Sequence, residues 1–347
     1  MRAIIGWDIG GAHLKAARAE NGRIVAVEQL ASPLRLGLGS VEAALAEARL
    51  RLGSADQHVV TMTAELADTF ASRAEGVTAI AATVERELAG GPIHLYAGRA
   101  GFIAPTVAGD HVADIASANW HATAALAAWR QTSGLVADMG STTTDLIPVT
   151  DGRIAAQGYT DAERLASGEL VYTGVVRSFL MASAQRAPFR GRWCTLINEN
   201  FANMADVHRV LDSLPEGVDL MPTADGRGRS IKASCARLAR IVGCDLSDAD
   251  APGWRALARW FAEQQLRAVT DAAMLVLSQT ALPDNAPLII AGAGADILQE
   301  VARRLSRPAV RFDSLLDATA ESREAASRCA PAAALALLAA ALPDLDA

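Results

Sequence analysis

The stretch that decides the fold of this chain reads Leu135-Val136-Ala137-Asp138-Met139-Gly140-Ser141-Thr142-Thr143-Thr144-Asp145-Leu146. In it, an apolar run ends on Asp-x-Gly and then turns into hydroxyl residues. The stretch Ile4-Ile5-Gly6-Trp7-Asp8-Ile9-Gly10-Gly11-Ala12-His13 has a similar layout. Buried strands that present backbone N–H groups to an anion have this pattern. The sequence therefore predicts two phosphate-binding loops in corresponding settings.

The residue types in these loops suit a diphosphate and a hard cation. Glycine lets the backbone approach a phosphate closely, and hydroxyl groups add hydrogen-bond donors. The carboxylates of Asp8 and Asp138 repel phosphate, so we expect them to hold Mg²⁺ between the loops, with Lys15 or Arg99 neutralising remaining charge. The expected phosphate ligands are Gly10, Gly11, His13, Lys15, Gly140, Ser141, Thr142 and Thr143. The alternative is a pair of unrelated strand-ending turns with Asp caps.

Composition narrows the class of protein. The chain has 347 residues, 51% hydrophobic and 20% charged, which is typical of a globular protein large enough for two domains. A net charge of −7 argues against nucleic-acid binding, because that function needs a dense basic surface. No apolar window approaches the roughly 18 residues of a membrane span, and an expected strand opens the chain, so we expect a cytoplasmic protein without a membrane partner. The four cysteines lack CxxC spacing and are expected to be reduced.

Turn signals and apolar spacing predict the local structure. Asn21-Gly22 is the tip of an expected hairpin that makes strands 2–8 and 23–30 antiparallel neighbours, and Asp151-Gly152 marks a second hairpin. Further strands are expected at 58–64, 93–97 and 287–291. Helices are expected at 41–52, 76–88, 115–130, 233–242, 297–306 and 331–342.

The start of the chain is thus repeated later on, as an Asp-ending strand, a loop, a returning strand and a hairpin. This organisation resembles the actin, Hsp70 and sugar-kinase superfamily. The resemblance implies an α/β chain with a duplicated ribonuclease-H-like, two-lobed fold around a central cleft. The first lobe is expected at 1–130 plus about 320–347, and the second at 131–320 with an inserted segment at about 185–250. Gly292 and Gly294, which follow the strand at 287–291, resemble the superfamily's adenosine-contacting loop.

The segment between the second hairpin and that glycine loop is less generic. The stretch Ser167-Gly168-Glu169-Leu170-Val171-Tyr172-Thr173 is expected to place Glu169 at a helix start, where a carboxylate can bind metal, accept a proton or cap the helix. Arg227, Arg229 and Lys232 lie in a loop before the helix at 233–242. That loop suits either a diphosphate or a solvated surface.

Six stretches carry a narrower resemblance, at 7–15, 116–120, 138–145, 167–173, 198–206 and 223–227. Together they are similar to the hydantoinase/oxoprolinase-related proteins of tetrahydromethanopterin-linked C1 transfer, whose archaeal relatives are synthases of methanofuran biosynthesis. The resemblance implies an enzyme that transfers a furanylmethyl group from its diphosphate to the phenolic oxygen of a tyrosine- or tyramine-derived acceptor and releases pyrophosphate. It implies Mg²⁺ on Asp8 and Asp138, cations of the 221–232 loop on the diphosphate, and Glu169 or Asp138 as the base. The substrate-binding residues that we expect from the matching stretches are Asn119, Tyr172, Thr173, Asn198, Glu199 and Asn200.

Two other classes of function remain open from the residues alone. An ATP-dependent kinase or amide hydrolase would use the same loops for ATP, and a nucleotide-sensing regulator would need no chemistry at all. The transferase needs only the furan diphosphate, the phenolic acceptor and Mg²⁺, so ATP dependence separates these classes. The two lobes are expected to close around the diphosphate, and the sequence leaves a homo-oligomer open.

Overall fold

The N-terminal part of the chain forms a sheet in the order β3-β2-β1-β4-β5-β6, in a computed structural model that describes residues 2–88 and 90–342. Three antiparallel strands lead the sheet, β1 (Ala3–Ile9), β2 (His13–Glu20) and β3 (Arg23–Ala31). On the other side of β1 lie the parallel strands β4 (Gln57–Met62) and β5 (Ile93–Tyr96), with β6 (Phe102–Ile103) at the edge. Every residue of β1 is buried, as expected for the central strand.

The second sheet repeats this order as β10-β8-β7-β13-β14, with β9 also paired to β8. Its central strand β7 (Gly134–Met139) is antiparallel to β8 (Thr144–Thr150), which pairs with β9 (Arg153–Ile154) and β10 (Leu170–Val171). β13 (Leu288–Ala291) and β14 (Ala309–Arg311) continue the sheet in parallel. Each sheet therefore has an antiparallel hairpin on one side of its central strand and parallel strands on the other. This duplicated order is the ribonuclease-H-like arrangement of the actin, Hsp70 and sugar-kinase superfamily, so the predicted fold class is confirmed.

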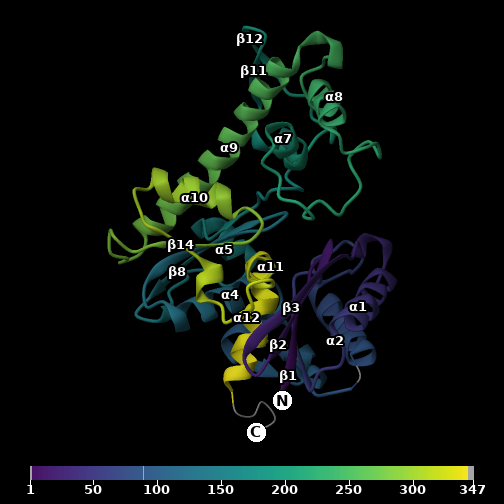
Figure 1. Ribbon diagram of the computed structural model, residues 1–347, viewed down its shortest axis with the longest axis vertical. Helices are drawn as coiled ribbons and strands as arrows, with labels where there is room; N and C mark the ends of the chain where they lie inside the picture. Colours follow the sequence, from purple (N-terminus) through teal and green to yellow (C-terminus); the bar gives the residue numbers. More distant parts are fainter. Residues whose placement is uncertain (1, 89, 343–347) are drawn as a thin grey trace.

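Two helices fill the space between the sheets. One buried cluster joins the first sheet to α4 (Asn119–Arg130), α12 (Ala330–Ala341) and the second sheet. α12 lies directly against β1 (Figure 1). A Cβ atom at Gly6 of β1 would lie 2.1 Å from the carbonyl oxygen of Ala332, so only glycine allows this approach. The outer face of the first sheet is covered by α1 (Gly39–Leu52) and α2 (Arg73–Glu87).

A third unit projects from the second lobe, at the top of Figure 1. It has its own buried cluster and overlaps the segment expected as an insertion. Its elements are α6 (Leu180–Ser183), β11 (Arg186–Phe189), β12 (Arg192–Thr195), α7 (Met204–Leu211), α8 (Ile231–Ile241) and the first part of α9 (Ala251–Ser278). The remainder of α9 packs with α10 (Ala295–Arg304) on the second sheet. α9 therefore connects the third unit rigidly to the second lobe.

The remaining helices are short. They are α3 (Val112–Ile115), α5 (Asp161–Ser167), α11 (Arg323–Arg328) and the 3-10 helices Leu34–Leu36, Gly98–Ala100, Pro105–Asp110, Leu246–Asp248 and Phe312–Leu315. Across the part of the chain that the structure describes, every helix is too short or too polar to cross a bilayer.

Three local predictions need correction. The turn at Asn21-Gly22 has the expected positive φ angles of 49° and 78°, but it joins β2 to β3. The strands expected at 2–8 and 23–30 are therefore not neighbours. The chain turns back after the first loop, and β2 lies between them. The helix expected at 115–130 is broken at 116–118, where Ser117 has a φ of 54°. Glu169 follows a helix end, because Gly168 adopts the left-handed conformation that terminates α5. The other predicted strands and helices are confirmed to within a few residues.

Candidate active site

The two predicted phosphate loops line one cavity of about 110 Å³ between the lobes. Both loops close with the same hydrogen bond, since Gly10 N donates to His13 O at 3.0 Å and Gly140 N donates to Thr143 O at 2.9 Å. The predicted residues that line this inner cavity are Asp8, Gly10, Gly11, His13, Lys15, Asn119, Asp138, Gly140, Ser141, Thr142 and Thr143. The structure thus brings together the residues predicted for both loops.

Strand register explains which charges face the inner cavity. Asp8 of β1 stands opposite Lys15 of β2, and Asp138 of β7 stands opposite Asp145 of β8. Directly opposed residues of antiparallel strands point to the same face of the sheet. The duplicated hairpins therefore present a carboxylate with a lysine in the first lobe and two carboxylates in the second.

Burial sets the electrostatics of these groups. It raises the pKa of Asp8, although Lys15 Nζ, 3.4 Å from Asp8 Oδ2, opposes the shift. It raises the pKa of Asp138 to about 7; Lys15 opposes this shift, and Asp145 and Asp8 add to it. Burial lowers the pKa of Lys15, but the neighbouring carboxylates raise it by more, so Lys15 is a cation. The cavity consequently contains more carboxylates than its lysine can neutralise.

These carboxylates fit a magnesium ion shared with a phosphate ligand. Asp8 Oδ1 is buried and has no hydrogen-bond partner among the described residues, and Asp138 lines the same cavity. Mg²⁺ typically takes one or two protein carboxylates, waters and substrate phosphate oxygens. Within residues 2–88 and 90–342, no group of three or more His, Cys, Asp or Glu side chains could enclose a metal by itself. Asp8 and Asp138 therefore suit a metal whose remaining ligands are waters and the phosphate oxygens of a bound anion.

His13 supplies a neutral polar group at the same place. Its side chain is buried, and its Nε2 has no partner in the described part of the chain. Burial lowers the pKa of His13 to about 4, and the charges of Lys15 and Arg177 contribute. The imidazole is therefore neutral at physiological pH and can donate one hydrogen bond to an anion.

A larger outer cavity of about 410 Å³ continues from the inner one. The two share Asn119, Thr142, Thr143, Asp145 and Arg177 among their walls. The apolar part of the outer wall includes Leu66, Ala67, Leu170, Tyr172 and Met221. Of the predicted substrate-binding residues, Asn119 and Tyr172 lie here, and the mixed wall suits an aromatic substrate with polar groups.

Thr173 lies behind the second loop, outside both cavities. Its hydroxyl accepts a hydrogen bond from Gln265 Nε2 at 2.9 Å, and the same nitrogen donates to Gly174 O at 2.8 Å. Gln265 Oε1 in turn lies 2.9 Å from His208 Nε2. Thr173, His208 and Gln265 are all buried, so these bonds form a polar chain from α7 through α9 to the back of the site.

The segment that this chain holds supports the second loop. A Cβ atom at Gly174 would lie 2.5 Å from the backbone nitrogen of Thr142. The backbone nitrogen of Arg177 donates to Ser141 O at 2.8 Å. The side chain of Arg177 lines both cavities and has no ion pair among the described residues. Arg177 is therefore a free cation at the junction of the cavities.

Glu169 is saturated by hydrogen bonds and lines neither cavity in the described structure. Its carboxylate accepts from Gln157 N at 2.7 Å, from Gly158 N at 2.8 Å and from Ser167 Oγ at 2.7 Å. These hydrogen bonds hold the loop at residues 157–158, before α5, against Ser167 at the end of that helix. Arg99 is likewise engaged elsewhere, with its guanidinium 4.7 Å from the centre of the Tyr159 ring.

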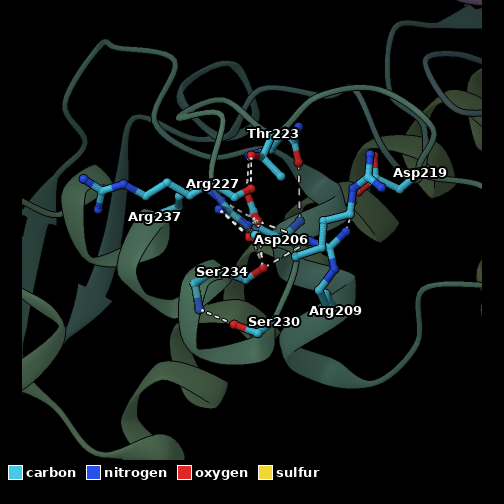
Figure 2. Close-up of polar contacts among 12 residues, drawn as sticks. Asp206, Arg209, Asp219, Thr223, Arg227, Ser230, Ser234 and Arg237 are labelled. Carbon is cyan, nitrogen blue, oxygen red and sulfur yellow. Dashed lines mark hydrogen bonds and ion pairs between the residues drawn. The ribbon is translucent and has the colours of Figure 1, made fainter.

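The predicted cationic loop belongs to the third unit (Figure 2). The ion pairs that hold this loop run from Arg209 and Arg229 to Asp219, and from the buried Arg237 to Asp206 and Asp225. None of Arg227, Arg229 and Lys232 lines the inner or the outer cavity, and Asn198, Glu199 and Asn200 are exposed on the same unit. The loop approaches the site through Met221, which lines the outer cavity.

Gly292 and Gly294 allow close packing behind the inner cavity. A Cβ atom at Gly292 would lie 2.3 Å from Met139 O, and one at Gly294 would lie 2.2 Å from Met139 Sδ. These glycines therefore bring the start of α10 against β7 and do not line either cavity in the described residues.

Sequence reasoning missed many of the wall residues, among them Thr63, Ser117, Asp145 and Arg177. A signal existed for Asp145, because its spacing from Asp138 equals that of Lys15 from Asp8. Arg177 carries no such local signal, since it reaches the cavity only because Gly174 folds against the second loop.

Comparison with known proteins gives the family. A model of hydantoinase/oxoprolinase matches residues 56–338. The chain belongs to the hydantoinase/oxoprolinase family. The predicted family resemblance is thereby confirmed, and the two sequence relatives below narrow it.

A protein of Methanocaldococcus jannaschii named (4-{4-[2-(gamma-L-glutamylamino)ethyl]phenoxymethyl}furan-2-yl)methanamine synthase is 32% identical over 243 residues, which are 70% of this chain and 72% of that protein. A protein of the same name from Methanococcus vannielii is 30% identical over 173 residues, 50% of this chain and 76% of that protein. Among solved structures, component A of (R)-2-hydroxyglutaryl-CoA dehydratase from Acidaminococcus fermentans aligns with a TM-score of 0.47 at 12% identity, over 99% of this chain and 100% of that one.

Proposed function

We propose that this protein is a transferase of methanofuran or methylofuran biosynthesis, which joins a furanylmethyl diphosphate to the phenolic oxygen of a tyrosine- or tyramine-derived acceptor and releases pyrophosphate. The observation that carries the proposal is the continuity of the two cavities. A small polar cavity between two phosphate-type loops opens into a larger cavity with an apolar wall. The name of the two archaeal relatives, which describes a phenoxymethylfuran ether, supports the same chemistry.

The inner cavity is the proposed site of the diphosphate. The glycine turns offer backbone N–H groups, Thr142 and Thr143 offer hydroxyls, and Lys15 and Arg177 offer positive charge. Asp8 and Asp138 would hold Mg²⁺, which neutralises the charge that develops on the leaving pyrophosphate. Preorganised donors at the leaving group are usually the largest electrostatic contribution to such a reaction.

The outer cavity is the proposed site of the acceptor. Tyr172, Leu66 and Met221 offer apolar surface to an aromatic ring at the mouth of the inner cavity. During transfer, the bond between the furanylmethyl carbon and the diphosphate oxygen breaks, and its electron pair leaves with pyrophosphate. The phenolic oxygen forms the new C–O bond and loses its proton. Because Asp138 is assigned to the metal and Glu169 is saturated, our proposal assigns that proton to a group on the wall of the outer cavity.

Pyrophosphate release tests the proposal. The assay combines an aminomethyl-substituted furanylmethyl diphosphate with Mg²⁺ and tyramine, γ-glutamyltyramine or tyrosine, with and without ATP, and identifies the product by mass spectrometry. We expect acceptor-dependent pyrophosphate and an ether product without ATP. Turnover that requires ATP would instead indicate a kinase or an amide hydrolase, and would overturn the transferase.

The two lysines of the chain provide a matched control. Lys15→Met removes a cation from the inner cavity and is expected to lower turnover about 10²-fold. Lys232→Met makes the same chemical change at an exposed position of the third unit and is expected to leave turnover unchanged. Equal effects of the two substitutions would contradict the placement of the diphosphate.

A further inference from the structure

Glu65 is a buried carboxyl group without a cation beside the outer cavity. It lies just after β4, is 1% exposed, and forms no ion pair within the described residues. Its Oε2 has no hydrogen-bond partner in that part of the chain, and its Oε1 accepts from Ser117 Oγ at 2.9 Å. Burial raises the pKa of Glu65 to about 7. Glu65 can therefore hold or release a proton near neutral pH.

Ser117 connects Glu65 to the cavity. It occupies the break between α3 and α4 with a φ of 54°, a conformation that is uncommon for residues other than glycine. Its side chain lines the outer cavity. Backbone strain of this kind is retained where the surrounding structure fixes it, and here the residue contacts Glu65 and Asp161 at the wall of the outer cavity.

The hydroxyl group of Ser117 lies between two carboxyl groups. Its Oγ lies 2.9 Å from Glu65 and 3.1 Å from Asp161 Oδ2, yet a hydroxyl group has only one proton to donate. Asp161 also accepts from Arg73 at 2.9 Å and from Arg164 at 3.0 Å, so it is an ionised carboxylate. When Glu65 is protonated, it can donate to Ser117, whose own proton then goes to Asp161; when Glu65 is ionised, Ser117 donates to Glu65 instead. Asp161 and Arg73 are the charged groups that face Glu65 from the neighbouring helices α5 and α2.

We propose, on the basis of the transferase function above, that Ser117 and Glu65 accept the proton of the phenolic acceptor. As the phenolic oxygen bonds to the furanylmethyl carbon, its proton passes to Ser117 Oγ, and the Ser117 proton passes to Glu65 Oε1. The broken C–O bond leaves its electrons on pyrophosphate, and Glu65 returns the proton to solvent when the product leaves. Ser117 is the catalytic residue of this step, and Glu65 acts through it.

The other carboxylates of the outer cavity are less suited to this role. Asp145 accepts a hydrogen bond from Arg164 and forms an ion pair with it, and Asp161 is paired with two arginines. Asp68 is exposed to solvent, so it is not held in a protected position beside the acceptor. Among the described acids near this cavity, Glu65 combines burial with the absence of a paired cation.

The test uses acceptors whose phenols differ in acidity. Turnover of wild type, Ser117→Gly and Glu65→Gln is measured with tyramine and with ring-fluorinated tyramines, whose phenols are more acidic. Ser117→Gly removes the hydroxyl and suits the left-handed backbone, so the variant is expected to fold. We expect both variants to lose about 10²-fold in turnover with tyramine and progressively less with the fluorinated acceptors. The Michaelis constant for the diphosphate is expected to stay unchanged.

The pH profile separates this role from a structural one. Glu65 must be ionised to accept the proton, so wild-type turnover is expected to rise with pH through about 7, and Glu65→Gln should lose this limb. Glu85→Gln, which makes the same change from carboxylate to amide at an exposed position of α2 outside both cavities, should behave as wild type. In the free protein, infrared difference spectra of wild type and Glu65→Gln should show a protonated carboxyl group that titrates over the same range.

Two outcomes distinguish the inference from the function on which it rests. If wild type forms the ether and both variants match it across the fluorinated series, the proton-accepting pair is wrong and the transferase stands. If wild type forms no ether with any acceptor, the proposed function fails and the pair fails with it.

Discussion

Replacing Gln265 by leucine tests whether the buried polar chain behind the second loop stabilises the site. Gln265 is 1% exposed, and its amide connects His208 of α7 to Thr173 and Gly174. Leucine has a similar volume, so the substitution removes polar contacts without opening a large cavity. Its effect therefore reports the hydrogen bonds themselves.

The expected magnitude follows from those contacts. Three hydrogen bonds are lost, at 2.9, 2.9 and 2.8 Å. Each contributes about 1 kcal/mol net, and a buried polar group left without a partner costs about 1–3 kcal/mol. Gly174 O keeps a hydrogen bond from Ser178 Oγ, whereas His208 Nε2 loses its partner. We expect the free energy of unfolding to fall by about 3 kcal/mol.

Urea denaturation measures this change, and amide hydrogen exchange over residues 174–177 locates it. Exchange there should accelerate, because this segment holds the second loop. The control is Gln299→Leu, the same change at an exposed position of α10, for which a change within about 0.5 kcal/mol is expected. A Gln265→Leu variant that unfolds like this control, with unchanged exchange at 174–177, would refute the reasoning.

Three further predictions follow from the site. Gly174→Ala should displace the second loop, because its Cβ would lie 2.5 Å from Thr142 N. We expect a large rise in the Michaelis constant for the diphosphate. An unchanged Michaelis constant would contradict the packing of Gly174 against this loop. Mg²⁺ binding should weaken as pH falls below about 7, because burial raises the pKa of Asp138 to about 7 and the metal needs the ionised carboxylate. Isothermal titration calorimetry should find that Mg²⁺ affinity depends less on pH in Asp138→Asn. Glu169→Gln should lower the free energy of unfolding by about 1–3 kcal/mol, because the carboxylate accepts hydrogen bonds from Gln157, Gly158 and Ser167. Turnover of the folded enzyme should stay normal. A loss of turnover without a loss of stability would indicate that Glu169 takes part in the reaction.

The two phosphate loops could be predicted because their signal is local. An apolar strand, an Asp-x-Gly turn and small or hydroxyl residues determine the backbone of each loop within a few positions of one another. The turn residues of both hairpins were equally informative, since Asn21 and Asp151 adopt the positive φ that their sequences favour. Strand pairing is not local, and β2 was missed because its sequence, His13–Glu20, has three charged residues on a mostly buried strand.

The rest of the candidate site depends on contacts between distant segments. Arg227, Arg229 and Lys232 resemble a diphosphate site in sequence, but Arg229 forms an ion pair with Asp219 within the third unit, and Lys232 is exposed on α8. Glu169 looks like a free acid because the backbone nitrogens that satisfy it belong to residues 157 and 158. Conversely, the sequence predicts Ser117 inside a helix, whereas the structure places it in a helix break with a φ of 54° at the wall of the outer cavity.

The contact between Gly6 and Ala332 has a consequence for how the protein is made. β1 ends at Ile9, whereas the helix that covers it, α12, begins at Ala330 and is therefore synthesised long after β1. At about 5–20 residues per second, the apolar face of the first sheet waits roughly 15–65 s for its covering helix. A nascent chain can therefore complete its second lobe before its first. We therefore expect chaperones to protect the first sheet during translation. We also expect deletion of α12 to prevent folding of the whole protein, because α12 covers β1.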